Sequence, residues 1–233
     1  MHKVLTTFFV LLTVASVTMA GPKLDVPERS FDFGKIIQNS TLVHSFWLKS
    51  VGDDTLRVLN IWPGCGCTQV PLEDSTIAPG DSTELQIILD TRRFKGHITK
   101  RPSLQTNADT AKVYLQVMAE MVMDPDSSYP LVLSPRWIDV SQYTVKPRRR
   151  GKLTINNRSD LEVNITPIDT ERKGFDPRLP ETIGPGDSAE VVIIVDEDQV
   201  ESSFMQSITF EATSPMGRYR YSIPIRRDYN PKH

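Results

Sequence analysis

Cys65 and Cys67 are the only two cysteines among the 233 residues, and one glycine separates them. A thiolate is both a nucleophile and a metal ligand, so a closely spaced pair can form a disulfide, bind a soft metal or exchange electrons. In a strand, residues two apart point to the same face, and both sulfur atoms then meet one partner or each other. The candidate residues for binding or redox chemistry are Cys65 and Cys67 with the flanking Trp62 and Thr68.

Three interpretations of the cysteine pair stay open from the sequence. The first is a disulfide between Cys65 and Cys67, with Gly66 free to take unusual backbone angles. Closing a loop of three residues contributes only about 1.6 kcal/mol before strain is subtracted, so this bridge is a weak cross-link. In this structural interpretation Trp62 packs beside the cysteines, whereas an exposed Trp62 would be an aromatic anchor for a partner.

The second interpretation is a soft-metal site. Two thiolates suit copper(I) or zinc, but zinc normally takes four ligands, and His44 and His97 are the only imidazoles within the body of the chain that could complete the set. His44 alternates with Phe46 and Leu48, which predicts a histidine satisfied at the edge of the core. The sequence therefore predicts no cofactor, and copper or zinc is the alternative.

The third interpretation is thiol redox exchange. A strained small ring is reduced more easily than an ordinary structural disulfide. The spacing of Cys65 and Cys67 is not C-x-x-C, however, and no helix N-terminus is expected beside them to lower a thiol pKa. The sequence pattern therefore supplies no activating group for this chemistry.

Residues 1–20 are predicted to be a signal peptide. Lys3 provides the positive amino-terminal charge, an apolar run begins at Phe8, and we expect cleavage after Ala20. The apolar run is too short to span a bilayer, and no later segment qualifies. Because Gly21 and not a cysteine follows the cleavage point, we expect no lipid anchor. The sequence predicts an exported, soluble protein of the periplasm or the extracellular space, where cysteines meet oxidising conditions.

Short segments of alternating apolar and polar residues follow, as is typical of strands with one buried face. Sustained helical periodicity is absent from residues 21–233, and the chain has 17 prolines. These features predict an antiparallel sandwich. Strands are expected at residues 31–34, 42–49, 56–61, 85–89, 104–106 and 113–117, with turns at 51–54, 78–82 and 107–109.

The second half of the sequence repeats the first. Residues 79–85 (PGDSTEL) recur 106 residues later at 185–191 (PGDSAEV). We therefore predict an all-β protein with two tandem immunoglobulin-like antiparallel β-sandwich domains, residues 21–123 with the Cys-Gly-Cys motif and residues 131–233 without cysteines. The polar, proline-bounded segment 124–130 is the expected linker.

Alignment of the two halves indicates that the fold does not need the cysteines. When Pro63 is placed on Pro167 without gaps, Asp169 and Glu171 stand where the cysteines stand in the first half. If the second domain folds without cysteines, Cys65 and Cys67 have a role that is specific to the first domain.

Several short motifs occur in the order seen in a family of exported bacterial domains of unknown function. They are Phe31-Asp32-Phe33-Gly34, His44-Ser45-Phe46, Cys65-Gly66-Cys67-Thr68, Pro79-Gly80-Asp81 and Thr106-Asn107. Residues 26–119 therefore resemble this family, which in turn looks like the Hydin and major-sperm-protein branch of the immunoglobulin-like sandwiches. The resemblance implies the fold and export, and it supplies no reaction.

Charge and motifs exclude several functions. The formal net charge of −2, one unit lower without Lys3, removes any strong electrostatic case for nucleic acid or an anionic membrane. The chain has no nucleophile elbow, zincin motif, P-loop or dinucleotide fingerprint, so no enzyme activity is expected.

The sequence predicts a non-enzymatic binding or structural module of the bacterial cell envelope with a protein partner. A sandwich edge can accept a strand from such a partner, which gives a mode of binding without a pocket. Two alternatives are a soft-metal or thiol-redox protein that uses Cys65 and Cys67, and a periplasmic chaperone-like protein. The chaperone hypothesis requires a basic pair between the domains and a hydrophobic strand offered to a subunit.

Overall fold

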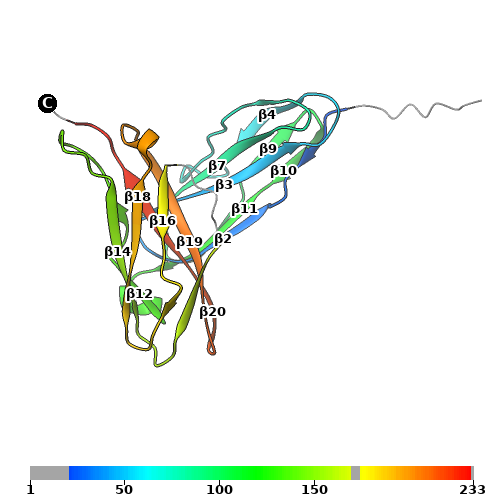
Figure 1. Cartoon of the computed structure of the whole chain (residues 1–233). Coiled ribbons are helices and arrows are strands. Elements are labelled where there is room, and N and C mark those ends of the chain that lie inside the picture. The colour runs from blue at the N-terminus through cyan, green and yellow to red at the C-terminus, as the bar shows by residue number, and fades with distance from the viewer. Residues whose placement is uncertain (1–20, 169–173, 232–233) are drawn as a thin grey trace, which may run out of the picture.

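The structure, a computed structural model, describes residues 21–168 and 174–231. The predicted signal peptide, residues 1–20, lies outside them. Figure 1 shows a first sandwich (residues 21–122) and a second sandwich (residues 131–231) set at an angle to each other. Among the described residues the helical segments are the short turns η1 (Pro125–Ser128) and η2 (Glu197–Gln199). The prediction of an all-β protein with two sandwiches is confirmed.

The first sandwich contains β1 to β11. Sheets form in the orders β1-β3-β7-β5 and β10-β9-β4-β6, while β11 pairs with both β2 and β8. The bounds are β1 Leu24–Asp25, β2 Ser30–Ile37, β3 Thr41–Ser50, β4 Leu56–Trp62, β5 Thr68–Gln69, β6 Thr76–Ile77, β7 Ser82–Asp90, β8 Gly96–Lys100, β9 Ser103–Thr106, β10 Asp109–Tyr114 and β11 Gln116–Val122.

Alternation along β3 places its even-numbered side chains in the core. Leu42, Phe46 and Leu48 are buried and pack in one hydrophobic cluster with Phe33. The odd-numbered face was expected to be open, yet Val43 is also buried. The reason is that the second sandwich covers this part of β3, as the hydrogen bonds below show.

Two strand predictions need correction. The expected strand 113–117 is interrupted, because β10 ends at Tyr114 and β11 begins at Gln116. Between them Leu115 is buried, and its amide donates to the carbonyl of Pro102 at 3.0 Å, so the chain passes here from one sheet into another. The sequence pattern also misses β8, because Ile98 is the only apolar residue in it.

The second sandwich contains β12 to β20. One sheet has the order β12-β14-β18-β16, and the other includes β17-β15-β19-β20 with β13 paired to β20. Strands β19 and β20 form a long hairpin that runs in register from Phe204 opposite Arg227 to Ser214 opposite Gly217. The bounds are β12 Leu131–Ser134, β13 Ile138–Asp139, β14 Arg150–Asn157, β15 Val163–Pro167, β16 Phe175–Arg178, β17 Thr182–Ile183, β18 Ser188–Val195, β19 Phe204–Ser214 and β20 Gly217–Arg227.

The Pro-Gly-Asp turn of each sandwich has the same geometry. Gly80 and Gly186 have φ angles of 85° and 69°, in the left-handed region that glycine enters without steric cost. In both turns the aspartate carbonyl accepts a hydrogen bond from the end of the preceding long strand. These bonds run from Ser50 N to Asp81 O and from Asn157 N to Asp187 O, both 2.9 Å. The wider internal repeat stays a prediction.

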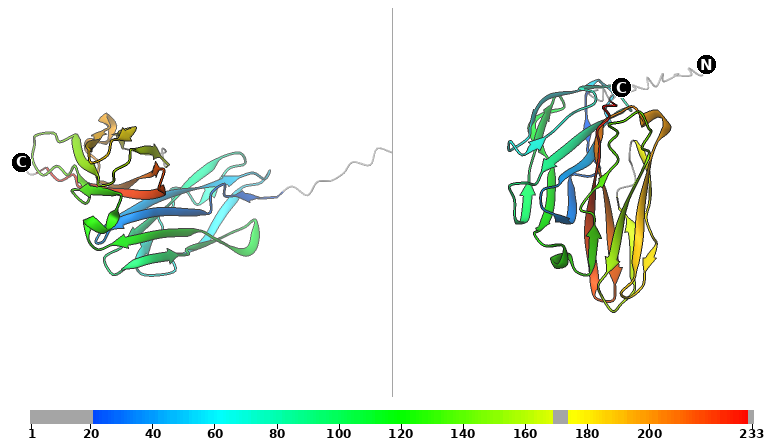
Figure 2. Two further views of the ribbon diagram at one scale, coloured as in Figure 1. Left: turned by 90° about the horizontal axis from the view of Figure 1, so that it is seen from below. Right: turned by 90° about the vertical axis from the view of Figure 1, so that its left-hand side faces the viewer.

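The two sandwiches share one sheet. Strand β20 lies parallel to β2, with Tyr221 opposite Lys35, so the order β17-β15-β19-β20-β2-β11-β8 runs through both. The left view of Figure 2 shows the red β20 beside the blue β2. The approach is close because β2 has a register irregularity at Gly34, whose φ is 67°. A Cβ atom on Gly34 would overlap the backbone carbonyl group of Arg220.

Small hydroxyl side chains satisfy the polar backbone at this junction. Ser222 donates to the carbonyl of Phe33 at 2.7 Å and forms a second hydrogen bond with Thr209, also at 2.7 Å. Ser207 accepts a hydrogen bond from the amide of Val43 at 2.9 Å. Strand β1 pairs with β3 only at Lys49 and Ser50, so it does not reach the amide of Val43. Ser207 supplies the hydrogen-bond acceptor that this amide would otherwise lack.

Gly34→Ala should disrupt the junction through steric overlap. Gly80→Ala is the matched control, because its φ is also positive but no atom lies within 4 Å of its Cβ position. We expect the control to lower the free energy of unfolding by about 1 kcal/mol from backbone strain alone, and Gly34→Ala to lower it by about 3 kcal/mol. Urea unfolding measures both values. Equal losses in the two variants would contradict the close contact at Gly34.

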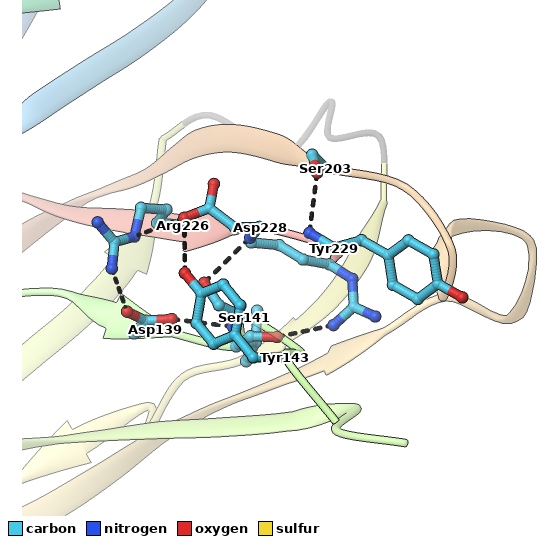
Figure 3. Close-up of polar contacts among 9 residues, drawn as sticks. Asp139, Ser141, Tyr143, Ser203, Arg226, Asp228 and Tyr229 are labelled. Atoms are coloured by element: carbon cyan, nitrogen blue, oxygen red, sulfur yellow. Dashed lines mark hydrogen bonds and ion pairs between the residues drawn. The ribbon is translucent and has the colours of Figure 1, made fainter. Parts of the chain in front are cut away.

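A polar network closes the end of the second sandwich where β13 meets β20 (Figure 3). Arg226 pairs with Asp139 at 2.6 Å and with Asp228 at 3.6 Å, and Tyr143 donates to Asp228 at 2.9 Å. The adjacent Arg227 is fully buried, and burial lowers its pKa. Its acceptors are the carbonyls of Val140, Arg148 and Val200 and the side-chain oxygen of Gln142.

Asp139→Asn should destabilise the protein in a pH-dependent way. Partial burial opposes ionisation of Asp139, but hydrogen bonds from Ser141 and Arg226 outweigh it and hold the pKa of Asp139 below its ordinary value. The stabilisation is present above the unfolded pKa of about 4 and is lost as the pH falls through the lower folded pKa. We expect a loss of about 1 kcal/mol at pH 7 that disappears at low pH.

Denaturant unfolding of the wild type and variant between pH 2 and pH 7 measures this difference. Asp176→Asn is the control, because Asp176 pairs with Arg178 at 3.4 Å on an exposed surface and should change the free energy by less than about 0.5 kcal/mol. A loss for Asp139→Asn that stays constant below pH 4 would show that the charge of Asp139 is not the cause.

Candidate functional site

The cysteine stretch is a turn and not a strand. Strand β4 ends at Trp62, β5 begins at Thr68, and the amide of Thr68 donates to the carbonyl of Cys65 at 3.3 Å. The positive φ belongs to Gly64, at 81°, and not to Gly66 as the sequence suggested. The signal for this turn is the dipeptide Pro63-Gly64, which follows Trp62 directly. The same-face argument for the sulfur atoms is therefore wrong, although the turn brings them together by another route.

Cys65 and Cys67 form a disulfide beside the hydroxyl group of Thr68. The Thr68 Oγ1 atom lies 3.3 Å from the Cys65 Sγ atom and 3.6 Å from the Cys67 Sγ atom. Thr68 is buried, whereas both cysteines are partly exposed. Cys67 packs against the hydrophobic core of the first sandwich, and its carbonyl accepts a hydrogen bond from Asp90 at 2.9 Å. The disulfide thus lies at the edge of the hydrophobic core, in contact with the hydroxyl group of Thr68.

The disulfide lines a recess of about 430 Å³. The rest of its lining, here called the wall, comes from the end of β7, from the segment that follows β7 and from the end of β8. It carries the cations of Arg92, Arg93 and Lys100, one acidic group, Asp90, and the ring of Phe94. The recess that the disulfide lines therefore has an excess of positive charge in its wall.

Two of the wall side chains are held by neighbours. Arg92 donates through Nε to Asp90 at 2.8 Å, and this hydrogen bond holds the pKa of the Asp90 carboxyl group below its ordinary value. The Lys100 ammonium group lies 4.0 Å from the ring centroid of Phe94. Asp90 offsets part of the charge of Arg92, so Arg93 and Lys100 supply most of the positive field.

Sequence reasoning identified the disulfide side of this recess but missed the wall. The signal for it is the basic run Arg92-Arg93-Phe94-Lys95, which begins two residues after the end of β7 at Asp90. Its relation to the cysteines depends on the pairing of β5 with β7, in which Thr68 stands opposite Leu89. This pairing is not visible in the sequence.

Trp62 does not line the recess. Its side chain is 36% exposed, and the ammonium group of Lys112 on β10 lies 3.7 Å from the ring centroid. The ring is therefore neither packed over the cysteines nor fully open to solvent. It forms part of the outer face of the β10-β9-β4 sheet.

The histidines suggested as metal ligands lie elsewhere. His44 is buried, stacks on Phe31 at a centroid distance of 3.6 Å and lies 3.2 Å from Glu28. His97 is exposed on β8, 4.0 Å from Glu120. Across residues 21–168 and 174–231, no group of three His, Cys, Asp or Glu side chains is placed to hold a metal ion. Asp169 and Glu171, the residues aligned with the cysteines, lie outside the described residues.

A second recess of the first sandwich lies beside strand β10. Its volume is about 520 Å³, and residues of β1 and β10 line it. Lys23, Arg29 and Lys112 contribute positive charge, and Asp109 is the acidic side chain among the lining residues. Strand β10 pairs with β9 alone within the described chain, so its other edge faces this groove.

Residues 24–121 match the model of the family described as protein of unknown function, DUF1573. The first sandwich is a match to DUF1573. The predicted relation of residues 26–119 to a family of domains of unknown function is confirmed, whereas the resemblance to the Hydin and major-sperm-protein branch stays a prediction. The comparison with curated proteins found no match.

Solved structures resemble the whole chain or half of it at low identity. A protein of unknown function from Porphyromonas gingivalis W83 is 15% identical, with 87% of this chain and 99% of that chain covered and a TM-score of 0.36. The CupB2 chaperone of Pseudomonas aeruginosa is 9% identical over 85% and 99%, with a TM-score of 0.31. PapD-like domain 7 of human CEP192 is 8% identical over 51% and 98%, with a TM-score of 0.35.

The part of the chain that the structure describes has no helix with the length and apolar character needed to cross a bilayer.

Gly64→Ala and Gly66→Ala should have opposite outcomes in the cysteine turn. Gly64 has a positive φ, and an added Cβ would lie 3.3 Å from the carbonyl oxygen of Arg101, whereas the Cβ position of Gly66 has no atom within 4 Å. We expect Gly64→Ala to lower the free energy of unfolding by about 1 to 2 kcal/mol and Gly66→Ala to change it by less than about 0.5 kcal/mol. Urea unfolding of the oxidised variants provides the test, and equal losses would contradict this geometry.

Proposed function

We propose that the protein is a non-enzymatic, exported module of the cell envelope that binds an extended acidic segment of a partner protein along β10. The observation that carries the proposal is the open edge of β10 beside a positively charged groove. An edge strand presents unpaired N–H and C=O groups, which an incoming strand can satisfy. Export rests on the predicted signal peptide and accords with a disulfide that persists in oxidising compartments.

The charge of the groove selects the partner. Lys23, Arg29 and Lys112 are all exposed and outnumber Asp109, although the whole chain has a formal net charge of −2. Positive potential at one recess of an otherwise acidic protein attracts acidic segments and repels basic ones. The side chain of Tyr114 is 59% exposed at the end of β10 and can serve as an aromatic anchor for such a segment.

The alternatives have less support. Soft-metal binding needs thiolates, and the disulfide ties up both sulfur atoms of Cys65 and Cys67. The chaperone hypothesis needs a basic pair free between the two sandwiches. Lys35 and Arg220 lie at that junction, but they donate to the carbonyls of Tyr129 and Asp32 at 2.8 and 3.1 Å.

A fluorescein-labelled decapeptide of alternating glutamate and valine tests the proposal. Fluorescence anisotropy measures its affinity for the wild type and for the double variant Lys23→Glu/Arg29→Glu. We expect the variant to bind about tenfold more weakly, because charge repulsion replaces attraction at the groove. Lys112 stays unchanged, since its ammonium group covers Trp62.

The matched control is Arg136→Glu/Lys146→Glu, which makes the same change of charge at exposed positions of the second sandwich. We expect it to weaken binding less than twofold. Hydrogen exchange gives an independent readout, because a bound strand should protect amides of β10. Equal weakening in both double variants, or protection confined to other strands, would overturn the proposal.

A further inference from the structure

We propose that the Cys65–Cys67 disulfide is a reactive bond that accepts two electrons from a dithiol in an acidic segment of another protein. The proposal is independent of binding along β10, because it concerns the other recess of the first sandwich. It rests on three observations: the disulfide lines an open recess, the other residues that line this recess carry an excess of positive charge, and a buried hydroxyl group contacts both sulfur atoms.

The position of the disulfide distinguishes it from a structural cross-link. A bridge of this loop length contributes little to stability, about 1.6 kcal/mol before strain. It also connects residues of one turn, which the hydrogen bond from Thr68 N to Cys65 O already closes. The bond therefore adds little to the fold, and its exposure in a recess of about 430 Å³ leaves it open to an incoming thiolate.

The two sulfur atoms have different surroundings. Cys67 packs against the hydrophobic core of the first sandwich. Cys65 also lines the recess, and among the described residues it is not one of those packed against that core. An incoming thiolate therefore reaches the Cys65 Sγ atom first, and Cys67 is the sulfur that leaves.

The exchange takes two steps that balance atoms and electrons. A thiolate of the partner attacks the Cys65 Sγ atom, a partner–Cys65 bond forms, the Cys65–Cys67 bond breaks, and Cys67 leaves as a thiolate. The second partner thiolate then attacks the partner sulfur of this mixed disulfide and releases Cys65 as a thiolate. The partner loses two electrons and two protons and gains a disulfide, while Cys65 and Cys67 gain two electrons and take up two protons from solvent.

Thr68 and the cationic wall stabilise the thiolates that form. Thr68 Oγ1 lies 3.3 and 3.6 Å from the two sulfur atoms, so its hydroxyl group can donate to whichever sulfur carries the charge. Arg93 and Lys100 supply the positive charge that a helix N-terminus supplies in other thiol sites. This is the activating environment that the C-x-C spacing alone does not reveal.

The same charges select an acidic substrate. Arg92, Arg93 and Lys100 outnumber Asp90 at the wall, so acidic residues beside the partner's cysteines are attracted and basic residues are repelled. The substrate class is therefore a dithiol segment rich in aspartate or glutamate.

The test uses the oxidised full chain and two reduced peptides that contain Cys-Gly-Gly-Cys, one flanked by glutamates and one by lysines. Chromatography follows peptide oxidation, and intact mass follows the gain of two hydrogens by the protein. We expect the acidic peptide to react about tenfold faster than the basic one. The double variant Arg93→Ser/Lys100→Ser should bring this ratio close to one, while the control Arg136→Ser/Lys146→Ser in the second sandwich should retain it.

Variants of Thr68 test the positioning role of the hydroxyl group. Thr68→Val removes the hydroxyl group and should slow exchange severalfold and raise the pKa of the reduced thiols, as measured by the pH profile of their alkylation. Thr68→Ser keeps the hydroxyl group and should restore both properties. Unfolding midpoints of all variants show whether a slower rate reflects loss of the fold.

A glutamate-flanked peptide with a single cysteine stops the reaction at the mixed disulfide. Tandem mass spectrometry should map this bond to Cys65. The oxidised free heptapeptide Trp-Pro-Gly-Cys-Gly-Cys-Thr is the reference for the reactivity of the same disulfide without the rest of the protein. If the folded protein reacts at the same rate and with the same lack of charge preference as this heptapeptide, or if the bond maps to Cys67, the proposal is overturned.

Discussion

The parallel contact between β20 and β2 is the interaction on which the arrangement of the molecule depends. It joins two strands whose paired residues, Lys35 and Tyr221, are 186 residues apart in the sequence, and it exists only because Gly34 has no Cβ atom to meet the Arg220 carbonyl. Buried serine and threonine hydroxyl groups then satisfy backbone atoms that no ladder reaches, such as the carbonyl of Phe33. A polar group left unpaired at such a junction would cost about 1 to 3 kcal/mol, so these side chains are as necessary as the apolar core.

In this sandwich fold the interior of the strands packs the core, and reactive side chains lie near the strand ends. Core positions of β3 and β7 are filled by apolar side chains, and even His44 is packed among aromatic rings there. Reactive groups therefore collect where strands end, at the turn that follows β4 and at the segment that follows β7. The pairing of β5 with β7 brings these two ends together and creates the recess that holds the disulfide.

The first sandwich carries both candidate sites, and they lie on different elements. The groove along β10 has an open strand edge, to which we assign the binding of a polypeptide, whereas the other recess has the disulfide and a hydroxyl group, to which we assign dithiol exchange. Both have positive charge, so acidic segments suit both. The second sandwich supports the first through the shared sheet and closes its own end with the network around Arg226 and the buried Arg227.

The sequence by itself determined the features that depend on neighbours along the chain. Alternation from Leu42 to Leu48 predicts β3, the Pro-Gly-Asp motif at residues 79–81 predicts a turn, and the paucity of helical pattern predicts the all-β class. Only the tertiary structure decided the break at Leu115, the burial of Val43, and the placing of Arg93 and Lys100 in one recess with Cys65. These depend on contacts between distant segments, and a local pattern records which face of a strand is apolar but not which strand or sandwich will cover it.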